Sequence, residues 1–369
     1  MFLLKALAFA LAGLVSLAIV GVFFIRLQPR LSSWYYKRNE PKPEVVPTQF
    51  DQSVTDQLDT HLANGDFGRV KTFIVSQSGE KLYEFNQPGV SSDELFRVWS
   101  VSKSVVSAAY GAGIEQGLID GVDVPISQAF PEFSDSYAAD PLRNSVTAAD
   151  LLTMRSGFKW DESGYPSDYH LFARSSDWMA YMAAREMARP GGEQFVYNTA
   201  NTIVLAEFIG RQTGQPFEQF VTESLFDKMG ITNWRWEYGP NGVVQAGGGL
   251  NLSPNDMLKI GQLYLNQGEW EGEQLVNREW IEESLAVQAS IPNYLDYGYH
   301  WWLVPNNSPL ARPLAVNDAY FASGLGGNYI WIVPHLDLVI VITAQDGSGQ
   351  MELAWPALKH FIFPALAEK

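Results

Sequence analysis

The stretch VWSVSKSVVSAAYGAGIEQG, residues Val98 to Gly117, decides how the rest of the chain is interpreted. Its many small apolar residues predict a helix that is packed on all sides. Ser100 and Lys103 are three positions apart, so both side chains would leave the same face of one helical turn. Ser100 would stand at the first turn, where unpaired N–H groups and the helix dipole favour a developing negative charge.

A lysine buried beside this serine could act as a base. Loss of solvation lowers the pKa of a lysine, and the neutral amine can take a proton from a serine hydroxyl. The stretch therefore predicts an acyl-enzyme that forms without histidine. The alternative is an ordinary helix cap followed by a surface lysine, and the S-x-x-K pattern alone does not decide between them.

The same pattern occurs twice more, in settings that do not predict catalysis. Ser78 and Lys81 lie between two alternating runs that read as strands, so they belong to a hairpin turn. Ser156 is followed at once by Gly157, which predicts a loop after a helix that ends near Met154. Of the three serines, Ser100 alone begins a long buried helix.

Composition and charge limit the possible partners. The chain has 369 residues, of which 46% are hydrophobic and 18% charged, so it can bury a large core. From Val45 onward it carries 19 basic and 39 acidic residues, a formal charge of −20. Nucleic acid needs a basic face, so we do not expect it as a partner of this part. The absence of cysteine excludes disulfides and thiol catalysis.

The N-terminus predicts a membrane anchor over residues 1–26. The run from Ala6 to Ile25 is apolar throughout, and about 20 such residues match the thickness of a bilayer core. A cleaved signal peptide would be followed by a small-x-small site, which is missing near its end. More basic residues follow the run than precede it, and by the positive-inside rule the C-terminal side would stay in the cytoplasm. Residues 27–50, with four prolines, predict a stiff linker.

Residues 51–369 are expected to form one globular domain. A helix from Val54 to Asn64 and a hairpin of Val70 to Ser76 with Lys81 to Asn86 come first. A long region rich in helix caps and 3.6-residue periodicity follows, and strands return near the C-terminus before a last helix at about 351–363. Strands from both ends of the chain would therefore enclose a helical middle.

Five segments carry a resemblance to a known family, in order along the chain: SVSKS, LLTMRSGFKWDE, PGGEQFVYNTANT, AGGGLNLSPNDMLKIGQLYLNQGE and FASGLGGNYIWIVPHLDLVIVIT. Together they resemble serine hydrolases of the penicillin-binding and class C β-lactamase superfamily, in particular its esterase and 6-aminohexanoate-dimer hydrolase branch. The resemblance implies an α+β fold of the β-lactamase/transpeptidase type, with an antiparallel sheet flanked by helices beside an all-α lobe. It also implies a globular domain in the periplasm, anchored in a bacterial inner membrane, against the charge bias around the anchor.

The resemblance also implies roles for single residues. Ser100 would be the nucleophile, Lys103 its proton acceptor, and Tyr197 the second-motif tyrosine that passes the proton to the leaving group. A tyrosine near a lysine cation is expected to ionise more easily than usual. The family's Tyr-x-Asn motif has Thr199 at its third place, so one of the flanking amides, Asn198 or Asn201, would substitute for the missing asparagine.

The third motif departs further from the family pattern. Ala322 stands where β-lactamases and peptidases carry a lysine or histidine that binds a substrate carboxylate. The glycines of this motif are present, so Gly324 and Gly326 would let a strand edge approach the substrate. An oxyanion hole needs only backbone N–H groups, for which Ser100 and Leu325 are the candidates.

The sequence thus predicts a membrane-anchored serine hydrolase that acts on a small ester or amide and needs no metal or cofactor. The five histidines show no metal-binding spacing, and no G-x-S-x-G motif of an α/β-hydrolase is present. A peptidoglycan DD-peptidase or weak β-lactamase is the alternative within this class. A catalytically silent penicillin-binding-like module that binds a ligand is the alternative outside it, and the missing cation at Ala322 is what that alternative expects.

Overall fold

A computed structural model describes residues 50–291, 295–305, 318–345 and 355–367. The predicted anchor at 1–26 and all of the predicted linker except its last residue lie outside these ranges. Among the residues that are described, no helix combines the length and the apolar character needed to cross a membrane.

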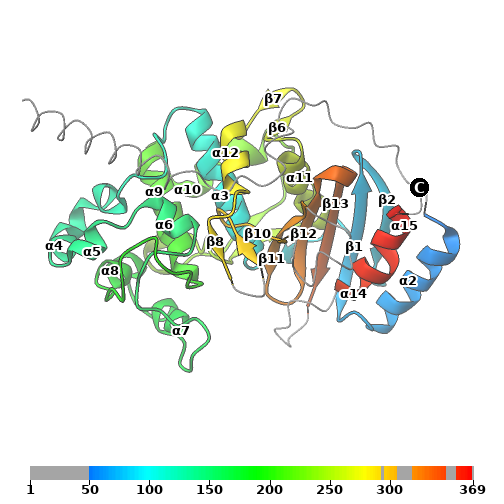
Figure 1. Cartoon of the computed structure of the whole chain (residues 1–369), viewed down its shortest axis with the longest axis horizontal. Coiled ribbons are helices and arrows are strands. Elements are labelled where there is room, and N and C mark those ends of the chain that lie inside the picture. The colour runs from blue at the N-terminus through cyan, green and yellow to red at the C-terminus, as the bar shows by residue number, and fades with distance from the viewer. Residues whose placement is uncertain (1–49, 292–294, 306–317, 346–354, 368–369) are drawn as a thin grey trace, which may run out of the picture. The chain divides into compact units, whose positions relative to one another are not determined.

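The described chain is a mixture of helices and mostly short strands (Figure 1). The strands are β1 (Val70–Gln77), β2 (Glu80–Asn86), β3 (Phe96–Arg97), β4 (Arg235–Trp236), β5 (Leu250–Leu252), β6 (Glu269–Trp270), β7 (Glu273–Gln274), β8 (Ala289–Ser290), β9 (Asp296–Tyr297), β10 (Trp302–Leu303), β11 (Tyr320–Gly324), β12 (Asn328–Val333) and β13 (Leu338–Ala344). The helices are α2 (Gln52–Asn64), α3 (Val101–Glu115), α4 (Ser134–Ala138), α5 (Pro141–Asn144), α6 (Ala148–Leu152), α7 (Asp168–Ala173), α8 (Trp178–Ala183), α9 (Thr199–Thr213), α10 (Phe217–Val221), α11 (Pro254–Leu265), α12 (Arg278–Ser284), α14 (Trp355–Ala357) and α15 (Phe363–Ala367).

The main sheet joins the two ends of the globular part, as the sequence predicted. Its strand order is β2-β1-β13-β12-β11-β10-β9-β8, and the neighbouring strands pair antiparallel. The β1–β2 hairpin turns through Ser78 and Gly79, both of which have positive φ. Phe73 of β1 lies opposite Ile342 of β13, which brings residues 269 positions apart side by side.

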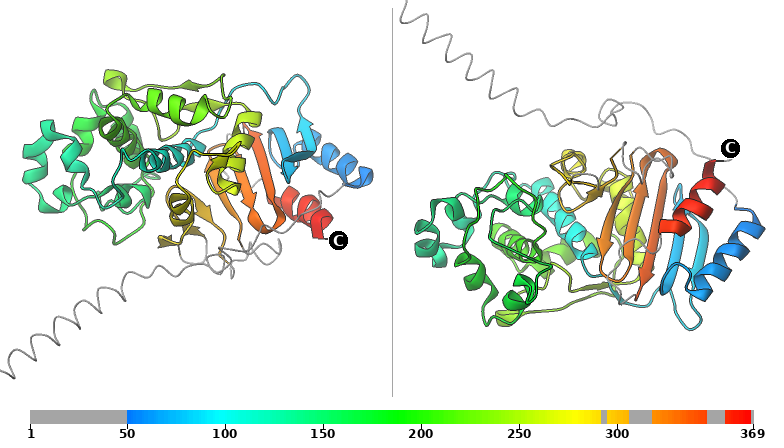
Figure 2. Two further views of the ribbon diagram at one scale, coloured as in Figure 1. Left: turned by 90° about the horizontal axis from the view of Figure 1, so that it is seen from above. Right: turned by 60° about the horizontal axis from the view of Figure 1, so that its bottom comes forward.

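Alternate residues of the central strands supply two separate hydrophobic cores, as the period of two in a strand requires. Phe73 and Ile340 face the core that α2 and the C-terminal helices cover, and both Figure 1 and Figure 2 show these helices on one side of the sheet. Ile74 and Val341 belong to the other core, which includes α3 and α11. The sheet is therefore covered on both faces.

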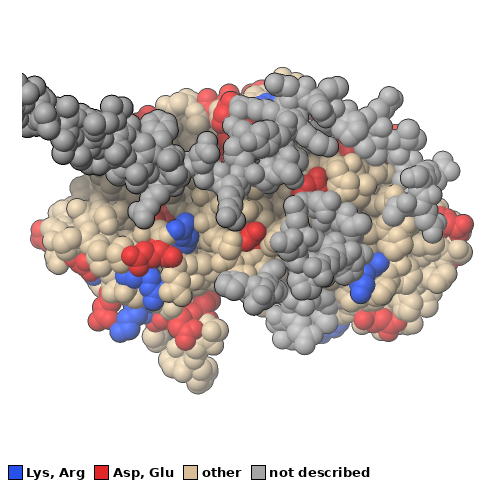
Figure 3. Space-filling view, in the orientation of Figure 1, with Lys and Arg blue, Asp and Glu red and all other residues tan. Residues whose placement is uncertain are grey.

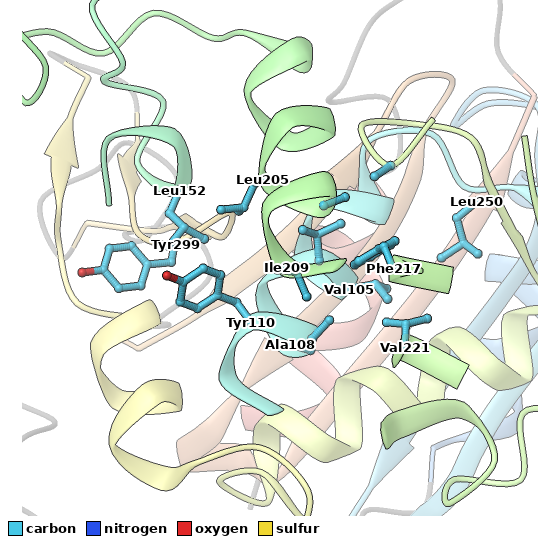
Figure 4. Close-up of a cluster of buried hydrophobic side chains, with 14 of the residues drawn as sticks. Val105, Ala108, Tyr110, Leu152, Leu205, Ile209, Phe217, Val221, Leu250 and Tyr299 are labelled. Carbon is cyan, nitrogen blue, oxygen red and sulfur yellow. The ribbon is translucent and has the colours of Figure 1, made fainter. Parts of the chain in front are cut away.

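Helix α3 lies at the centre of the second core. Its residues from Val101 to Gly113 are all buried, and it contacts β11 of the sheet as well as α9 of the helical lobe. Figure 4 shows Val105, Ala108 and Tyr110 of α3 among apolar side chains that come from distant segments. Gly111 is required here, because a Cβ at this position would lie 2.2 Å from the Trp280 ring. The predicted buried helix is confirmed.

Several helix ends also agree with the sequence. Thr147 and Asp150 form the reciprocal capping box at α6, Ser253 caps α11 with Pro254 in its first turn, and Gly214 ends α9 in a left-handed conformation. The stretch SSDWMAYMAAREM has apolar residues at helical spacing, but its helix is shorter than this periodicity predicts. It stops at Ala183, because the following chain turns back and Met187 forms a β-bridge with Phe158.

Candidate active site

Ser100 directly precedes α3, with its side chain free of any capping role. Its backbone is already helical, at φ −67° and ψ −6°, and its hydroxyl makes no capping hydrogen bond. Lys103 lies one turn later and is only 2% exposed. The alternative of an ordinary serine cap followed by a surface lysine is therefore wrong.

The Lys103 amine donates to three oxygen atoms from three segments of the chain. It lies 2.9 Å from Ser100 Oγ, 3.3 Å from Thr199 Oγ1 and 2.5 Å from the carbonyl oxygen of Gly247. Burial lowers the pKa of Lys103 to about 8, against an opposing effect of the Glu162 carboxylate. A substantial fraction of the amine is then neutral near pH 8 and can accept a proton.

Tyr197 lies against both of these residues. The centre of its ring is 5.0 Å from Lys103 Nζ, and its hydroxyl shares a hydrogen bond with Ser100. The ring also stacks on Trp302, with the two planes 14° apart. Burial raises the pKa of Tyr197, and the negative charge of Glu162 raises it further. The expectation that this tyrosine ionises easily was wrong, because loss of solvation outweighs its neighbours, so Tyr197 keeps its proton.

Glu162 and Thr199 extend the site in a way that the sequence did not reveal. Thr199 Oγ1 hydrogen-bonds Glu162 Oε1, and the backbone N–H of Thr199 donates to Glu162 Oε2 at 3.0 Å. Trp160 Nε1 donates to the same Oε2 atom at 2.7 Å. Thr199 thus connects a carboxylate to the Lys103 amine. The only signal in the sequence was the threonine at the third place of the Tyr-x-Asn motif.

The two amides proposed as substitutes for the motif asparagine serve other purposes. Asn201 is fully buried; its Oδ1 accepts from Ser156 Oγ at 3.1 Å, and its amide nitrogen is 3.9 Å from Met154 Sδ. Asn198 Oδ1 caps α9. The substrate-binding role predicted for Asn201 has no support in this geometry, because neither end of its amide faces an open surface.

The end of β11 lies against the backbone that leads into Ser100. A Cβ added to Gly324 would lie 2.1 Å from the carbonyl oxygen of Val98 and 3.3 Å from the backbone nitrogen of Ser100. Only glycine permits this approach. Leu325 follows and is half-exposed, and Gly326 turns the chain towards β12 with φ 83°. Gly324 therefore lies against the backbone at Ser100, and Leu325 and Gly326 follow it directly in the chain.

Two backbone N–H groups near this junction are the candidates for an oxyanion hole. Neighbouring residues such as Val98, Val101 and Gly327 donate hydrogen bonds from their backbone N–H groups. Within the described part of the chain, no such turn or loop hydrogen bond is formed by the N–H groups of Ser100 and Leu325. The residue before the nucleophile, Trp99, has φ 51°, and the Arg97 guanidinium lies 3.8 Å from its ring centroid. The strained turn and its stacked cation hold the backbone of Ser100 in place.

The two other serines of S-x-x-K patterns lie outside these contacts, and the side chains at positions 322 and 300 are uncharged. Ser78 is in the hairpin turn and Ser156 is a buried loop residue, as predicted. Ala322 is 1% exposed and lies opposite Ile330 in the sheet, so it offers no charge to a substrate. His300 is buried near Lys103, and burial lowers its pKa to about 3, so it is neutral.

No metal site was found among the described residues, and the face drawn in Figure 3 shows no basic surface. No group of three or more His, Asp or Glu side chains is arranged to hold a metal among these residues. On the face drawn in Figure 3, Lys and Arg side chains lie in small groups beside Asp and Glu, and the described residues form no continuous basic stripe. The exclusion of nucleic acid as a partner stays a prediction from the charge.

Comparisons with known proteins give relatives in sequence and in fold. The chain is 25% identical to the 6-aminohexanoate-dimer hydrolase of Paenarthrobacter ureafaciens over 342 residues, which cover 86% of this chain and 83% of that one. Among solved structures, EstCE1, a hydrolase with promiscuous acyltransferase activity, matches with a TM-score of 0.68 and 16% identity over 85% of this chain and 97% of its own. The octameric penicillin-binding protein homologue from Pyrococcus abyssi matches with a TM-score of 0.65 and 17% identity over 84% and 77%.

The two structural likenesses support the fold, which is the α+β arrangement that the sequence predicted. The Beta-lactamase family model matches residues 71–360, a range that includes Ser100, Lys103, Tyr197 and the β11–β12 turn. That match covers most of the globular part, and the chain therefore belongs to the beta-lactamase family of serine hydrolases and penicillin-binding proteins.

Proposed function

We propose that the protein hydrolyses a neutral ester or amide through an acyl-enzyme on Ser100. The observation that carries this proposal is the 2.9 Å contact between Lys103 Nζ and Ser100 Oγ in a site where the lysine is buried. A nucleophile within hydrogen-bond reach of a base of lowered pKa is the arrangement that nucleophilic catalysis requires.

The acylation step follows from these contacts. The Ser100 O–H bond breaks as its proton moves to neutral Lys103, and Oγ forms a bond to the acyl carbon of the substrate. The oxyanion is stabilised by the N–H groups of Ser100 and Leu325. Tyr197 is a neutral phenol before the reaction and hydrogen-bonds Ser100. It donates the phenol proton to the leaving group as that group departs. Tyr197 then regains a proton from the Lys103 ammonium, which leaves the amine neutral again. Water attacks the acyl carbon and gives a proton to this amine, and the proton passes to Ser100 Oγ as the bond between Oγ and the acyl carbon breaks.

The charges around the site favour a neutral substrate. Ala322 supplies no cation for a carboxylate, and the acidic globular part repels anions. These features argue against a DD-peptidase or a β-lactamase as the main activity. The intact Ser100–Lys103 contact argues against a silent binding module, because a module without catalysis has no need to bury a lysine beside a serine. The relative that hydrolyses a 6-aminohexanoate dimer supports an amide as one possible substrate class.

Labelling with a fluorophosphonate tests the proposal directly. The probe should attach to Ser100, as located by mass spectrometry, and Ser100→Ala should lose both labelling and turnover of a short-chain p-nitrophenyl ester. Ser78→Ala is the matched control, because Ser78 has the same S-x-x-K spacing but lies in a hairpin turn. A Ser100→Ala variant that keeps full esterase activity would place the active site elsewhere.

We also propose that residues 1–26 anchor the protein in a bacterial inner membrane, with the globular domain in the periplasm. The apolar run from Ala6 to Ile25 supports the anchor, and the family resemblance supports the side. Full-length protein should stay with membranes in alkaline carbonate, and protease added to intact spheroplasts should cleave the domain. Release of a soluble form that begins after residue 25 would instead indicate a cleaved signal peptide.

A further inference from the structure

The Lys103 amine contacts three oxygen atoms, but a neutral amine has only two protons and one lone pair. For proton transfer to start, that lone pair must face Ser100 rather than one of the other two partners. The Gly247 carbonyl oxygen can only accept, so it always takes one of the two amine protons. Thr199 can either donate or accept, so the direction of its hydroxyl proton decides where the lone pair of Lys103 lies.

Glu162 settles the direction of the Thr199 hydroxyl. The carboxylate is surrounded by three donors: the hydroxyl and the backbone N–H of Thr199, and the indole N–H of Trp160. An ionised carboxylate is an acceptor only, so the Thr199 proton lies towards Glu162. Thr199 Oγ1 then offers a lone pair to the second amine proton of Lys103, at 3.3 Å.

We propose that Glu162 is a positioning residue which, through Thr199, turns the lone pair of Lys103 towards Ser100. The inference rests on the proposed acyl-enzyme function and deepens it. With one amine proton on Gly247 and the other on Thr199, the lone pair of the neutral amine is left for Ser100, whose Oγ lies 2.9 Å from Nζ. The Ser100 hydroxyl would then donate to the neutral amine, whereas the charged amine donates to Oγ. Glu162 touches neither Ser100 nor the lysine in this arrangement; it acts through the hydroxyl of Thr199.

The other groups around Lys103 do not compete for this role. His300 is neutral at working pH, since its pKa is lowered to about 3 by burial and by the lysine charge. Tyr197 presents its ring face to the amine, and its hydroxyl is engaged with Ser100. Arg97 binds the carbonyl oxygen of Gly248, one residue beyond the carbonyl that Lys103 uses. Glu162 is therefore the group in this set that can orient the threonine.

Replacing Glu162 by glutamine should reverse the hydrogen bond. The amide oxygen would be held by the N–H groups of Thr199 and Trp160, which leaves the amide NH₂ facing Thr199 Oγ1. The hydroxyl must then accept, and its proton turns to Lys103 and occupies the lone pair. We expect kcat/KM and the rate of fluorophosphonate labelling to fall about 10- to 100-fold, within the usual contribution of one acid–base group.

The pH profile separates positioning from a merely structural role. Loss of the Glu162 charge lowers the pKa of Lys103, because this carboxylate raises it in the native protein. The acidic limb of the profile should therefore move to lower pH, by up to about one unit, although the maximal rate is smaller. Glu186→Gln is the matched control, because Glu186 is an exposed carboxylate paired with Lys159 on the same lobe; it should change neither quantity.

A double-mutant cycle tests whether the effect passes through Thr199. Thr199→Val should lose about as much activity as Glu162→Gln, Thr199→Ser should stay within about threefold of the wild type, and the double variant should be little worse than Thr199→Val alone. The proposal would be overturned if the activity losses of Glu162→Gln and Thr199→Val multiply in the double variant. It would also be overturned if the acidic limb of the Glu162→Gln profile does not move. If Glu162→Gln does not fold, a Thr199→Val variant that keeps wild-type labelling would overturn it equally. Failure of the wild type to label at Ser100 would instead refute the proposed function.

Discussion

The rate of Ser100 acylation should follow the neutral fraction of Lys103. Burial lowers the pKa of this amine from 10.5 to about 8, and a base acts only when it is deprotonated. With that pKa the neutral fraction is about one half at pH 8 and about 1% at pH 6, so kcat/KM should fall roughly fiftyfold between them. An ordinary lysine would be only about 0.3% neutral at pH 8.

The assay is the second-order rate of fluorophosphonate labelling and the kcat/KM of a neutral p-nitrophenyl ester between pH 6 and 9. Lys103→Arg serves as the comparison, because arginine keeps the charge but cannot be deprotonated in this range; it should lose about 10²- to 10⁴-fold at every pH. A rate that is flat from pH 6 to 9, or an arginine variant that labels as fast as the wild type, would refute the role of Lys103 as base.

Three further predictions concern packing and selectivity. Gly324→Ala should lose most activity while the rest of the fold persists, since its Cβ would lie 2.1 Å from the Val98 oxygen; labelling and circular dichroism check this. Ser156→Ala should keep activity but lose about 1 to 3 kcal/mol of unfolding free energy in urea, because the buried Asn201 oxygen loses its donor. With alanine at position 322, kcat/KM for neutral esters should exceed that for cephalosporins by at least about a hundredfold, and equal values would contradict this.

The neutral Tyr197 has a consequence for the order of proton transfers. Because burial raises the pKa of this phenol, a phenolate is not available to take the serine proton. In the proposed mechanism Lys103 is therefore the base of acylation, and Tyr197 is the donor to the leaving group. Burial favours the neutral form of each group and so shifts the two pKa values in opposite directions, which fits the proposed division into base and acid.

Much of the fold could be predicted because its signals are local. The capping box of Thr147 and Asp150, the Ser253 cap and the glycine stop at Gly214 each act within one helical turn. Likewise, the turn at Ser78 and Gly79 needs only two residues with positive φ. The proposed nucleophile could be predicted in the same way, because Ser100 and Lys103 lie on one turn of a helix whose small residues indicate burial.

The sequence by itself therefore predicted most helix ends, the hairpin and the pairing of Ser100 with Lys103, since each depends on residues a few positions apart. Only the tertiary structure decided what surrounds that base. Gly247 lies 144 positions from Lys103 and Thr199 lies 96 positions away, and Glu162 hydrogen-bonds the threonine that contacts the lysine. Burial is likewise a property of the packed chain, and it lowers the pKa of Lys103. Local sequence therefore did not reveal that Tyr197 stays protonated or that the amide of Asn201 is enclosed.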